Sequence, residues 1–317
     1  MTGDTAPPMP NPPSWLPGAA PVAVVLITLN EAHQLDDALA NLKGWAQEVF
    51  VVDSYSTDDT VSIALRHGVH VVQRRFRGFG DQWNFALRVL PVTAPWTMKL
   101  DPDERLTESC KTSILAAIAA GGADGFVLDL RLFFMGTRLP VRMSLTRVWR
   151  TGRCRFSDAA VNEHPLVDGR VSRIAGEIAH LDSPNLEHWL AKQNQYTTAE
   201  AVSLHRGLHA IEPRLLGNRL QRRAWMKVHY RQVPCRYLLT FLYHYVILGA
   251  WRAGRVGFIW AVLRTTVYRL VDYKRLDLQL GRRFLPTLRG AVGNPDPRVA
   301  QCDEEDAAQP RASRPAP

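Results

Sequence analysis

The sequence predicts an α/β protein with a doubly wound, mostly parallel sheet. Short continuous apolar runs, typical of strands buried on both faces, occur at residues 22–28, 48–52, 70–73 and 96–100. Segments with helical spacing of apolar side chains alternate with them at residues 31–42, 57–66 and 80–90. Strands that alternate with helices in this way form parallel sheets with right-handed crossovers, and ligands bind beyond the carboxyl ends of the strands.

Beyond residue 104 the alternation weakens. We expect a helix at residues 107–120, a strand at 125–134, irregular or strand-like chain at 141–149, and a long helix at 184–208. These elements complete a predicted catalytic domain over residues 21–208. The proline-rich residues 1–20 and the polar residues 291–317 are expected to be disordered tails. No signal peptide is recognised in the first 20 residues, and the four cysteines show no C-x-x-C spacing, which favours a reducing, cytoplasmic compartment.

Residues 209–290 differ from the rest of the chain in charge. The formal net charge of the protein is +9, and residues 206–289 alone hold 17 basic and 3 acidic side chains. Two apolar runs, 237–251 and 256–263, lie within this basic segment, and each is shorter than the roughly 20 residues of a bilayer span. Two short apolar helices flanked by arginines are typical of a helical extension that lies on an anionic membrane surface.

The strongest chemical signal is the run KLDPDE at residues 99–104, which follows a predicted buried strand. Asp101 and Asp103 stand one residue apart on a loop that leaves the sheet, and two such carboxylates can share a hard divalent cation such as Mg²⁺ or Mn²⁺. A cation of this kind neutralises the charge that grows on a diphosphate leaving group. An ordinary acidic loop is the alternative interpretation of this run.

Polar side chains also follow the first two predicted strands. Thr28, Asn30 and Glu31 end the first strand, and Asp53 and Ser56 end the second. If the sheet is parallel, these clusters meet the acidic run at one edge. Some of these side chains are alternatively explained as helix caps.

The series T-x-N-E, V-V-D-S-x-S-x-D-x-T and L-D-x-D-E resembles family 2 glycosyltransferases with the GT-A fold. The segments VNEHP (161–165) and 180–201, together with the basic extension, resemble the bacterial lipopolysaccharide-core glucosyltransferase-like branch. The resemblance covers roughly residues 22–280. It implies a GT-A-like α/β domain and a nucleotide-sugar donor. The residues that it implies for donor binding are Thr28, Asn30, Glu31, Asp53, Ser56, Asn84, Lys99 and Asp101.

The resemblance also implies roles in catalysis. Asp101 and Asp103 would hold the metal, and His180 is a further candidate ligand, although a lone histidine is more often structural. Family 2 enzymes that invert the anomeric centre need a general base for the acceptor hydroxyl. We expect Glu163 to be this base, with Asp158 as the second candidate and a surface ion pair as the alternative role of Glu163.

The function expected from these features is inverting transfer of a hexosyl group from a nucleotide-sugar, with a UDP-sugar as the expected donor. The acceptor would be a lipopolysaccharide-core or other lipid-linked glycan, and the enzyme would be peripheral on the inner face of the plasma membrane. One alternative is a polyprenyl-phosphate sugar transferase. Another is a non-catalytic nucleic-acid-binding protein, which the charge alone suggests, but no helix-turn-helix, RNA-recognition or zinc-finger signature supports it.

Overall fold

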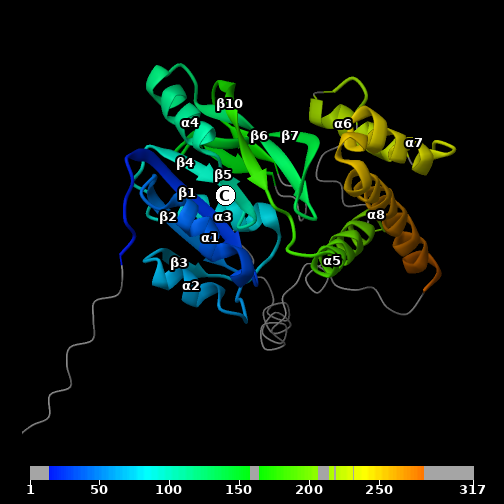
Figure 1. The fold of residues 1–317 in the computed structure, drawn as a ribbon, viewed down its shortest axis with the longest axis horizontal. Coiled ribbons are helices and arrows are strands. Elements are labelled where there is room, and N and C mark those ends of the chain that lie inside the picture. Colours follow the sequence, from blue (N-terminus) through cyan, green and yellow to red (C-terminus); the bar gives the residue numbers. More distant parts are fainter. Residues whose placement is uncertain (1–13, 158–163, 206–213, 218, 231, 282–317) are drawn as a thin grey trace, which may run out of the picture.

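The structure, a computed structural model, describes residues 14–157, 164–205, 214–217, 219–230 and 232–281. An eight-stranded sheet has the order β3-β2-β1-β4-β7-β6-β10-β5, and β8 and β9 form a separate hairpin (Figure 1). The strands are β1 Ala20–Thr28, β2 Ala46–Asp53, β3 His70–Gln73, β4 Trp96–Lys99, β5 Glu104–Leu106, β6 Gly125–Phe134, β7 Thr137–Arg150, β8 Cys154–Phe156, β9 Pro165–Val167 and β10 Val171–His180. The helices are α1 Ala32–Leu42, α2 Thr60–Arg66, α3 Phe79–Val89, α4 Glu108–Ala120, α5 Leu186–His205, α6 Arg219–Tyr230, α7 Arg236–Leu242 and α8 Gly254–Leu280.

The first half of the sheet is the predicted parallel arrangement. Strand β1 pairs in parallel with β2 and β4, and β2 pairs in parallel with β3. Residues 22–26 of β1 are fully buried, as expected for a strand that is covered on both faces. The prediction of a doubly wound α/β fold is therefore confirmed for this half.

The second half of the sheet is mixed. Strand β7 is antiparallel to both β4 and β6, whereas β10 is parallel to β6, so β4, β6 and β10 all run in the same direction. The open prediction for residues 141–149 resolves to the long strand β7. Its residues 142–145 are all exposed, which removes the apolar alternation that identifies a strand in a sequence.

Helices cover both faces of the sheet. Leu35 and Leu39 of α1, Ile63 of α2 and Ile114 of α4 pack into the core on one face. On the other face, Trp83 of α3 packs with β1, β2, β7 and β8 in a second core. These layers leave the carboxyl edge of the parallel strands free for the side chains described below.

The C-terminal helices pack against the end of the β6–β7 hairpin. Trp189 of α5 and Trp260 of α8 share a third core with Phe134 and Leu139 of that hairpin, and Figure 1 shows α5, α6, α7 and α8 together at this side of the sheet. Lys274 of α8 also donates hydrogen bonds to the carbonyl and side-chain oxygens of Asn194 on α5, at 2.7 and 2.6 Å. The extension therefore shares a core with the preceding domain.

The prediction of two short apolar helices is wrong for the second of them. The first run, residues 237–251, forms most of α7, the π-helical turn η1 Tyr243–Ile247 and the start of the 3₁₀ turn η2 Ala250–Ala253. The second run, residues 256–263, is only one part of the 27-residue helix α8. Arginines at the ends of the apolar run do not stop a helix, because arginine is a good helix former. In the described part of the chain, no single helix has the length and apolar character of a membrane span. The bent pair 236–247 and 250–280, at 67°, passes that test jointly by length and composition alone.

Candidate active site

Four strands end at the same edge of the sheet. Thr28 at the end of β1 lies opposite Asp53 at the end of β2, and Lys99 at the end of β4 lies opposite Val25 of β1. His180 ends β10, which runs in the same direction. The predicted meeting of three polar clusters is confirmed, and the structure adds the end of β10 as a fourth.

The loops after β1 and β2 are held together by side chains from both motifs. The carboxylate of Asp53 is fully buried and accepts hydrogen bonds from Thr28 Oγ1 at 3.0 Å, from the Ser56 backbone N–H at 2.9 Å and from Gln73 Nε2 at 3.0 Å. The hydroxyl of Ser56 accepts a hydrogen bond from the backbone N–H of Asn30 at 2.8 Å. These residues form a pre-organised frame, and their contacts with a nucleoside stay a prediction.

Two further predicted donor-binding residues, Asn84 and Lys99, lie at helix α3 or against it. The side-chain amide of Asn84 donates to the carbonyl of Phe156 at 3.0 Å and accepts from its N–H at 2.8 Å, which braces β8 against α3. Lys99 Nζ lies 4.7 Å from the ring centroid of Trp83. Asn84 therefore has a bracing role that its motif did not reveal, and its contact with a donor stays a prediction.

Arg147 of β7 forms ion pairs with two carboxylates of the acidic run at residues 101–104. Its guanidinium is almost fully buried, lies 3.2 Å from Asp101 Oδ2 and forms an ion pair with Glu104, whose carboxylate is completely buried. Burial would raise the pKa of Asp101, but Lys99 and Arg147 hold that pKa below its usual range. Burial raises the pKa of Glu104, and Arg147 opposes this rise. Asp101 is thus kept ionised at the edge of the site.

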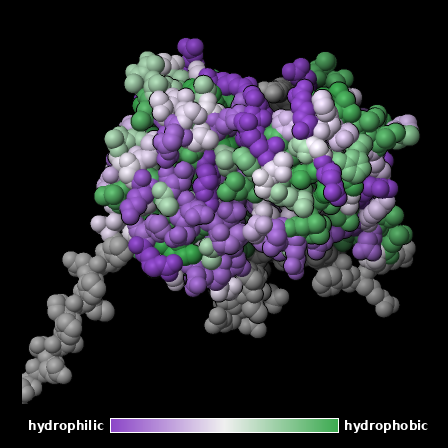
Figure 2. Space-filling view, viewed as in Figure 1, coloured by the Kyte–Doolittle hydropathy of each residue, from purple (hydrophilic) through white to green (hydrophobic). Residues whose placement is uncertain are grey.

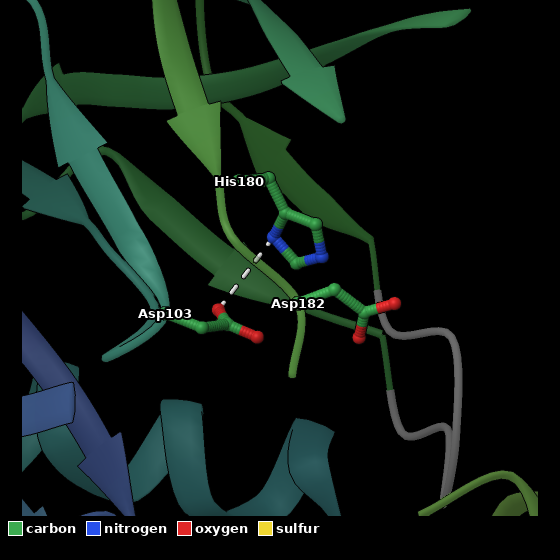
Figure 3. A group of neighbouring side chains, drawn as sticks. All are labelled: Asp103, His180 and Asp182. Atoms are coloured by element: carbon green, nitrogen blue, oxygen red, sulfur yellow. Dashed lines mark ion pairs between the residues drawn. The ribbon is translucent and has the colours of Figure 1, made fainter. Parts of the chain in front are cut away.

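Asp103, His180 and Asp182 converge on one point. One ligand atom from each of these residues lies within 4.8 Å of the others, and Figure 3 shows His180 facing Asp103, with Asp182 on the loop that follows β10. His180 Nδ1 is 3.5 Å from Asp103 Oδ1. Within the described residues, both of these atoms are buried without a hydrogen-bond partner. A buried carboxylate oxygen and a buried imidazole nitrogen that make no hydrogen bond are suitable ligands for a divalent cation. Asp103, His180 and Asp182 therefore fit a metal site.

Lys192 of α5 reaches into the same cluster. Its ammonium donates to Asp103 Oδ2 at 3.0 Å and lies 3.5 Å from Asp182 Oδ1. Burial lowers the pKa of His180, but Asp103 and Glu104 outweigh it and raise the value to about 9. When no cation is bound, the positive charges of Lys192 and of protonated His180 therefore offset part of the negative charge of the carboxylates in the site.

Glu31 completes this cluster from the end of β1. Burial, and then the charge of Asp103, raise the pKa of Glu31 to about 8. Burial also raises the pKa of Tyr196, on α5, to about 12. Glu31 is thus neutral near pH 7 and able to donate a hydrogen bond as long as no cation is added.

Sequence reasoning missed Asp182 and Lys192. Asp182 lies two residues beyond β10 with a φ of 55°, and only the pairing of β10 with β5 brings it beside Asp103. Lys192 lies on a helix 89 residues away from Asp103 in the chain. The predicted base, Glu163, and its alternative, Asp158, lie outside the described residues.

This chain is similar to known glycosyltransferases. Residues 23–173 match the family model described as glycosyl transferase family 2. These residues therefore correspond to a family 2 glycosyltransferase domain, and the sheet has the GT-A-like α/β arrangement that the motifs predicted.

Two relatives and one solved structure illustrate the similarity. The lipopolysaccharide core biosynthesis glycosyltransferase LpsC of Rhizobium meliloti is 25% identical over 287 residues, covering 86% of this chain and 98% of its own. An uncharacterized glycosyltransferase of Rickettsia prowazekii is 25% identical over 199 residues, covering 58% and 68%. The crystal structure of S. aureus TarS 1-349 in complex with UDP-GlcNAc is 16% identical with a TM-score of 0.42, covering 83% of this chain and 93% of that one.

Proposed function

We propose that this protein is a metal-dependent, inverting hexosyltransferase that uses a UDP-sugar. One observation carries the proposal: Asp103, His180 and Asp182 converge at the carboxyl edge of a family 2 glycosyltransferase domain, and the buried atoms Asp103 Oδ1 and His180 Nδ1 face each other at 3.5 Å without a hydrogen bond. Carboxylate oxygens and an imidazole nitrogen suit Mn²⁺, and the oxygens suit Mg²⁺. When bound, the cation would neutralise the charge that develops on the departing diphosphate.

The residues of the chain have separate tasks in this proposal. The frame of Thr28, Asn30, Asp53 and Ser56 binds and orients the nucleoside half of the donor. Lys99 and Asp101 border the diphosphate, and Arg147 keeps Asp101 ionised and fixed in position. Holding the donor in a single orientation is itself a large contribution to rate.

Inversion requires a base on the acceptor side. We propose Glu163 for this role, with its carboxylate taking the proton of the acceptor hydroxyl while that oxygen attacks the anomeric carbon. His164, the next residue in the chain, donates its backbone N–H to Ser157 Oγ at 3.0 Å, so the described chain resumes beside β8 and α3.

The acceptor we propose is a lipopolysaccharide-core or other lipid-linked glycan. The support comes from LpsC, whose name places it in lipopolysaccharide core biosynthesis and which matches this chain over almost its whole length. An acceptor anchored in a membrane would require the enzyme to work at a lipid surface.

The C-terminal helices offer such a surface. Large apolar side chains that are at least 41% exposed lie at four- and five-residue spacing on one face of α7 and η1, namely Leu238, Leu239, Leu242, Tyr243, Val246 and Ile247. Trp251 and Phe258 are also about half exposed, and the exposed Arg252 and Arg255 lie between them. Figure 2 shows hydrophobic residues gathered at the side where Figure 1 places α7 and α8.

We therefore propose peripheral attachment to the inner face of the plasma membrane. Apolar side chains would enter the acyl boundary, and each arginine near an anionic surface would add about 1 kcal/mol of attraction. Residues 236–247 and 250–280 meet at an angle of 67°, and in this proposal the bend between them is the part that enters the membrane interface.

A donor screen tests the proposed reaction. Release of UDP or GDP is measured with a panel of nucleotide-sugars, a core oligosaccharide acceptor and Mn²⁺, and the anomeric configuration of the product is read by NMR. We expect UDP release and an inverted product, loss of turnover in EDTA, and recovery when Mn²⁺ is added back. Full turnover in EDTA would refute metal dependence, and preferred transfer to a bare polyprenyl phosphate would refute the acceptor class.

A further inference from the structure

A cavity lies in the bend between η1 and α8, and none of its lining residues belongs to the proposed active site. It measures about 370 Å³ and is lined by Tyr245 of η1 and by Gly254, Arg255, Phe258 and Ile259 of the first two turns of α8. Sites for small ligands span roughly 300–1,000 Å³. The cavity is therefore large enough for part of one aliphatic chain.

Aromatic side chains form an apolar wall of this cavity. Tyr245 stacks on Phe241 with ring centroids 5.3 Å apart, and Phe258 meets both rings edge-on at 5.8 Å. These are arrangements that aromatic rings prefer, so the wall is formed before a ligand arrives. Phe258 nevertheless stays 49% exposed, which leaves apolar surface in water for a ligand to cover.

Gly254 keeps the cavity open where the chain turns from η2 into α8. Its φ is +57°, a left-handed conformation that glycine adopts without steric cost. Among the described residues, no atom lies within 4 Å of the position that a Cβ atom would take there. The turn therefore leaves open space beside Arg255.

Arg255 is the only lining residue with a formal charge. It is exposed and forms no ion pair within the described residues. Residues 213–271 hold 11 arginines and lysines and no aspartate or glutamate, so their own sequence supplies no carboxylate to this guanidinium. Arg255 also stands in the first turn of α8, where the helix dipole disfavours a cation, so stabilising that helix does not explain it.

A ligand that satisfies both features carries an anion next to an aliphatic chain. The guanidinium can bind a phosphate through two hydrogen bonds, and each methylene group that leaves water for the aromatic wall adds to the affinity. A lipid is the favoured source of this chemistry, because Val246 and Ile247, the next residues after Tyr245, belong to the exposed apolar face of α7 and η1. A lipid that reaches this face also reaches the cavity.

We propose that this cavity binds one molecule of an anionic phospholipid. The phosphate pairs with Arg255, and an acyl chain lies against Tyr245, Phe258 and Ile259. The proposal rests on the proposed attachment to a membrane and adds a partner class to it. The enzyme holds a single lipid in a saturable site, in addition to its general attraction to an anionic surface.

Monomeric short-chain lipids test the proposal without a membrane. Dihexanoyl phosphatidate, dihexanoyl phosphatidylcholine and inorganic phosphate are titrated into the full-length protein by calorimetry, each below the concentration at which it forms micelles. We expect one phosphatidate to bind per protein, and phosphatidylcholine to bind about tenfold more weakly because its headgroup has no net charge. Inorganic phosphate, which has no chain, should show no saturable binding.

Variants then locate the lipid. Arg255→Gln should weaken binding of phosphatidate about tenfold, because it removes the charged donor. Phe258→Ser should weaken binding of both lipids, since it removes apolar wall and leaves the charge. Arg222→Gln, which alters an exposed arginine on α6 within the same basic extension, is the matched control and should leave the affinity unchanged. Thermal unfolding checks each fold, and if Phe258→Ser is unfolded, the exposed Arg255 decides the question alone.

Three results would overturn the proposal: equal affinity for the two lipids, wild-type affinity in Arg255→Gln, or equal losses in Arg255→Gln and Arg222→Gln. The donor screen described above tests the proposed function separately. If the wild type releases UDP in that screen but binds no phosphatidate, the lipid site alone fails. If phosphatidate binds through Arg255 while no donor is turned over, the proposed function fails and the lipid site stands.

Discussion

Lys192 on α5 donates a hydrogen bond to Asp103 across the site, with Nζ 3.0 Å from Oδ2. The same ammonium lies 3.5 Å from Asp182. A positive charge therefore stands beside two of the three proposed ligands of the cation. Lysine and cation must share these carboxylates, so binding of the cation and the position of α5 are linked.

Lys192→Met should raise the affinity for Mn²⁺ about tenfold, because it removes a positive charge that competes for Asp103 and Asp182. The same change should lower the unfolding temperature of the metal-free protein, since two largely buried carboxylates lose their counter-charge. Calorimetric titration with Mn²⁺ and thermal unfolding measure both effects. Lys111→Met, which breaks a pair with Glu108 on α4, is the control. Weaker Mn²⁺ binding in Lys192→Met would show that the lysine assembles the site.

Asp182→Asn should weaken Mn²⁺ binding by at least tenfold, as should Asp103→Asn, because each removes a carboxylate that a hard cation requires. Asp103→Asn should in addition nearly abolish sugar transfer. The exposed Asp59, at the start of α2, gives the control variant Asp59→Asn, with unchanged affinity. Wild-type turnover of Asp103→Asn at limiting Mn²⁺ would remove Asp103 from the set of ligands.

The stability of the metal-free protein should fall as the pH rises from 6.5 to 9. The folded state raises the pKa of His180 from 6.5 to about 9. The stabilisation is therefore complete below pH 6.5 and is lost as the pH passes through 9. Glu31, with its pKa raised from 4.5 to about 8, changes stability in the same direction between those values. Urea unfolding in EDTA across this range measures the slope.

His180→Asn should flatten that slope, because the variant has no group that titrates at this position. Saturating Mn²⁺ should flatten it as well, since a cation that binds neutral imidazole replaces the proton. A slope in His180→Asn as steep as in the wild type would assign the pH dependence to other groups.

Glu163→Gln should lower kcat by roughly 10²-fold while leaving donor affinity nearly unchanged, as expected when a general base is lost. Asp158→Asn, the alternative site in the same stretch of chain, is the matched comparison. Steady-state kinetics and UDP titration separate the two effects. If Asp158→Asn shows the larger fall in kcat, the role of base passes to Asp158.

Leu242→Ser combined with Ile247→Ser should reduce binding to vesicles that contain anionic lipid, because both side chains are exposed on the face of α7 and η1. High salt should weaken binding of the wild type. Leu65→Ser, an exposed leucine on α2, should have no effect in a sedimentation assay. Release from cell membranes by detergent alone, with residues near 280 accessible from the far side, would show a spanning arrangement instead.

The strand ends that carry the first three clusters could be predicted because their evidence is local. A continuous run such as residues 22–28 identifies a buried strand by itself, and Asp53 and Asp101 then follow from chain order. Strand β7 and the length of helix α8 were harder to predict. In β7, the exposed residues 142–145 hide the apolar alternation that is typical of a strand. In α8, arginines interrupt the apolar run and hide the length of the helix.

The partners of Asp103 could not be predicted from chain order. His180 was a lone candidate, and its approach to Asp103 depends on the antiparallel pairing of β10 with β5, a three-residue strand. Lys192 points into the site only because α5 packs on the β6–β7 hairpin through Trp189. Each of these contacts joins residues more than 70 positions apart, and no spacing rule reaches that far.

The shared core of α5, α8 and the β6–β7 hairpin bears on modularity. Lys274 of α8 donates hydrogen bonds to Asn194, two residues from Lys192, so α8 braces the helix that supplies a charge to the candidate active site. A shortened enzyme that ends before Tyr237 would expose Trp189 and lose that brace. Likewise, a chimera that borrows its last helices from a relative would need matching residues on α5. The C-terminal helices and the candidate active site are therefore one structural unit in this chain.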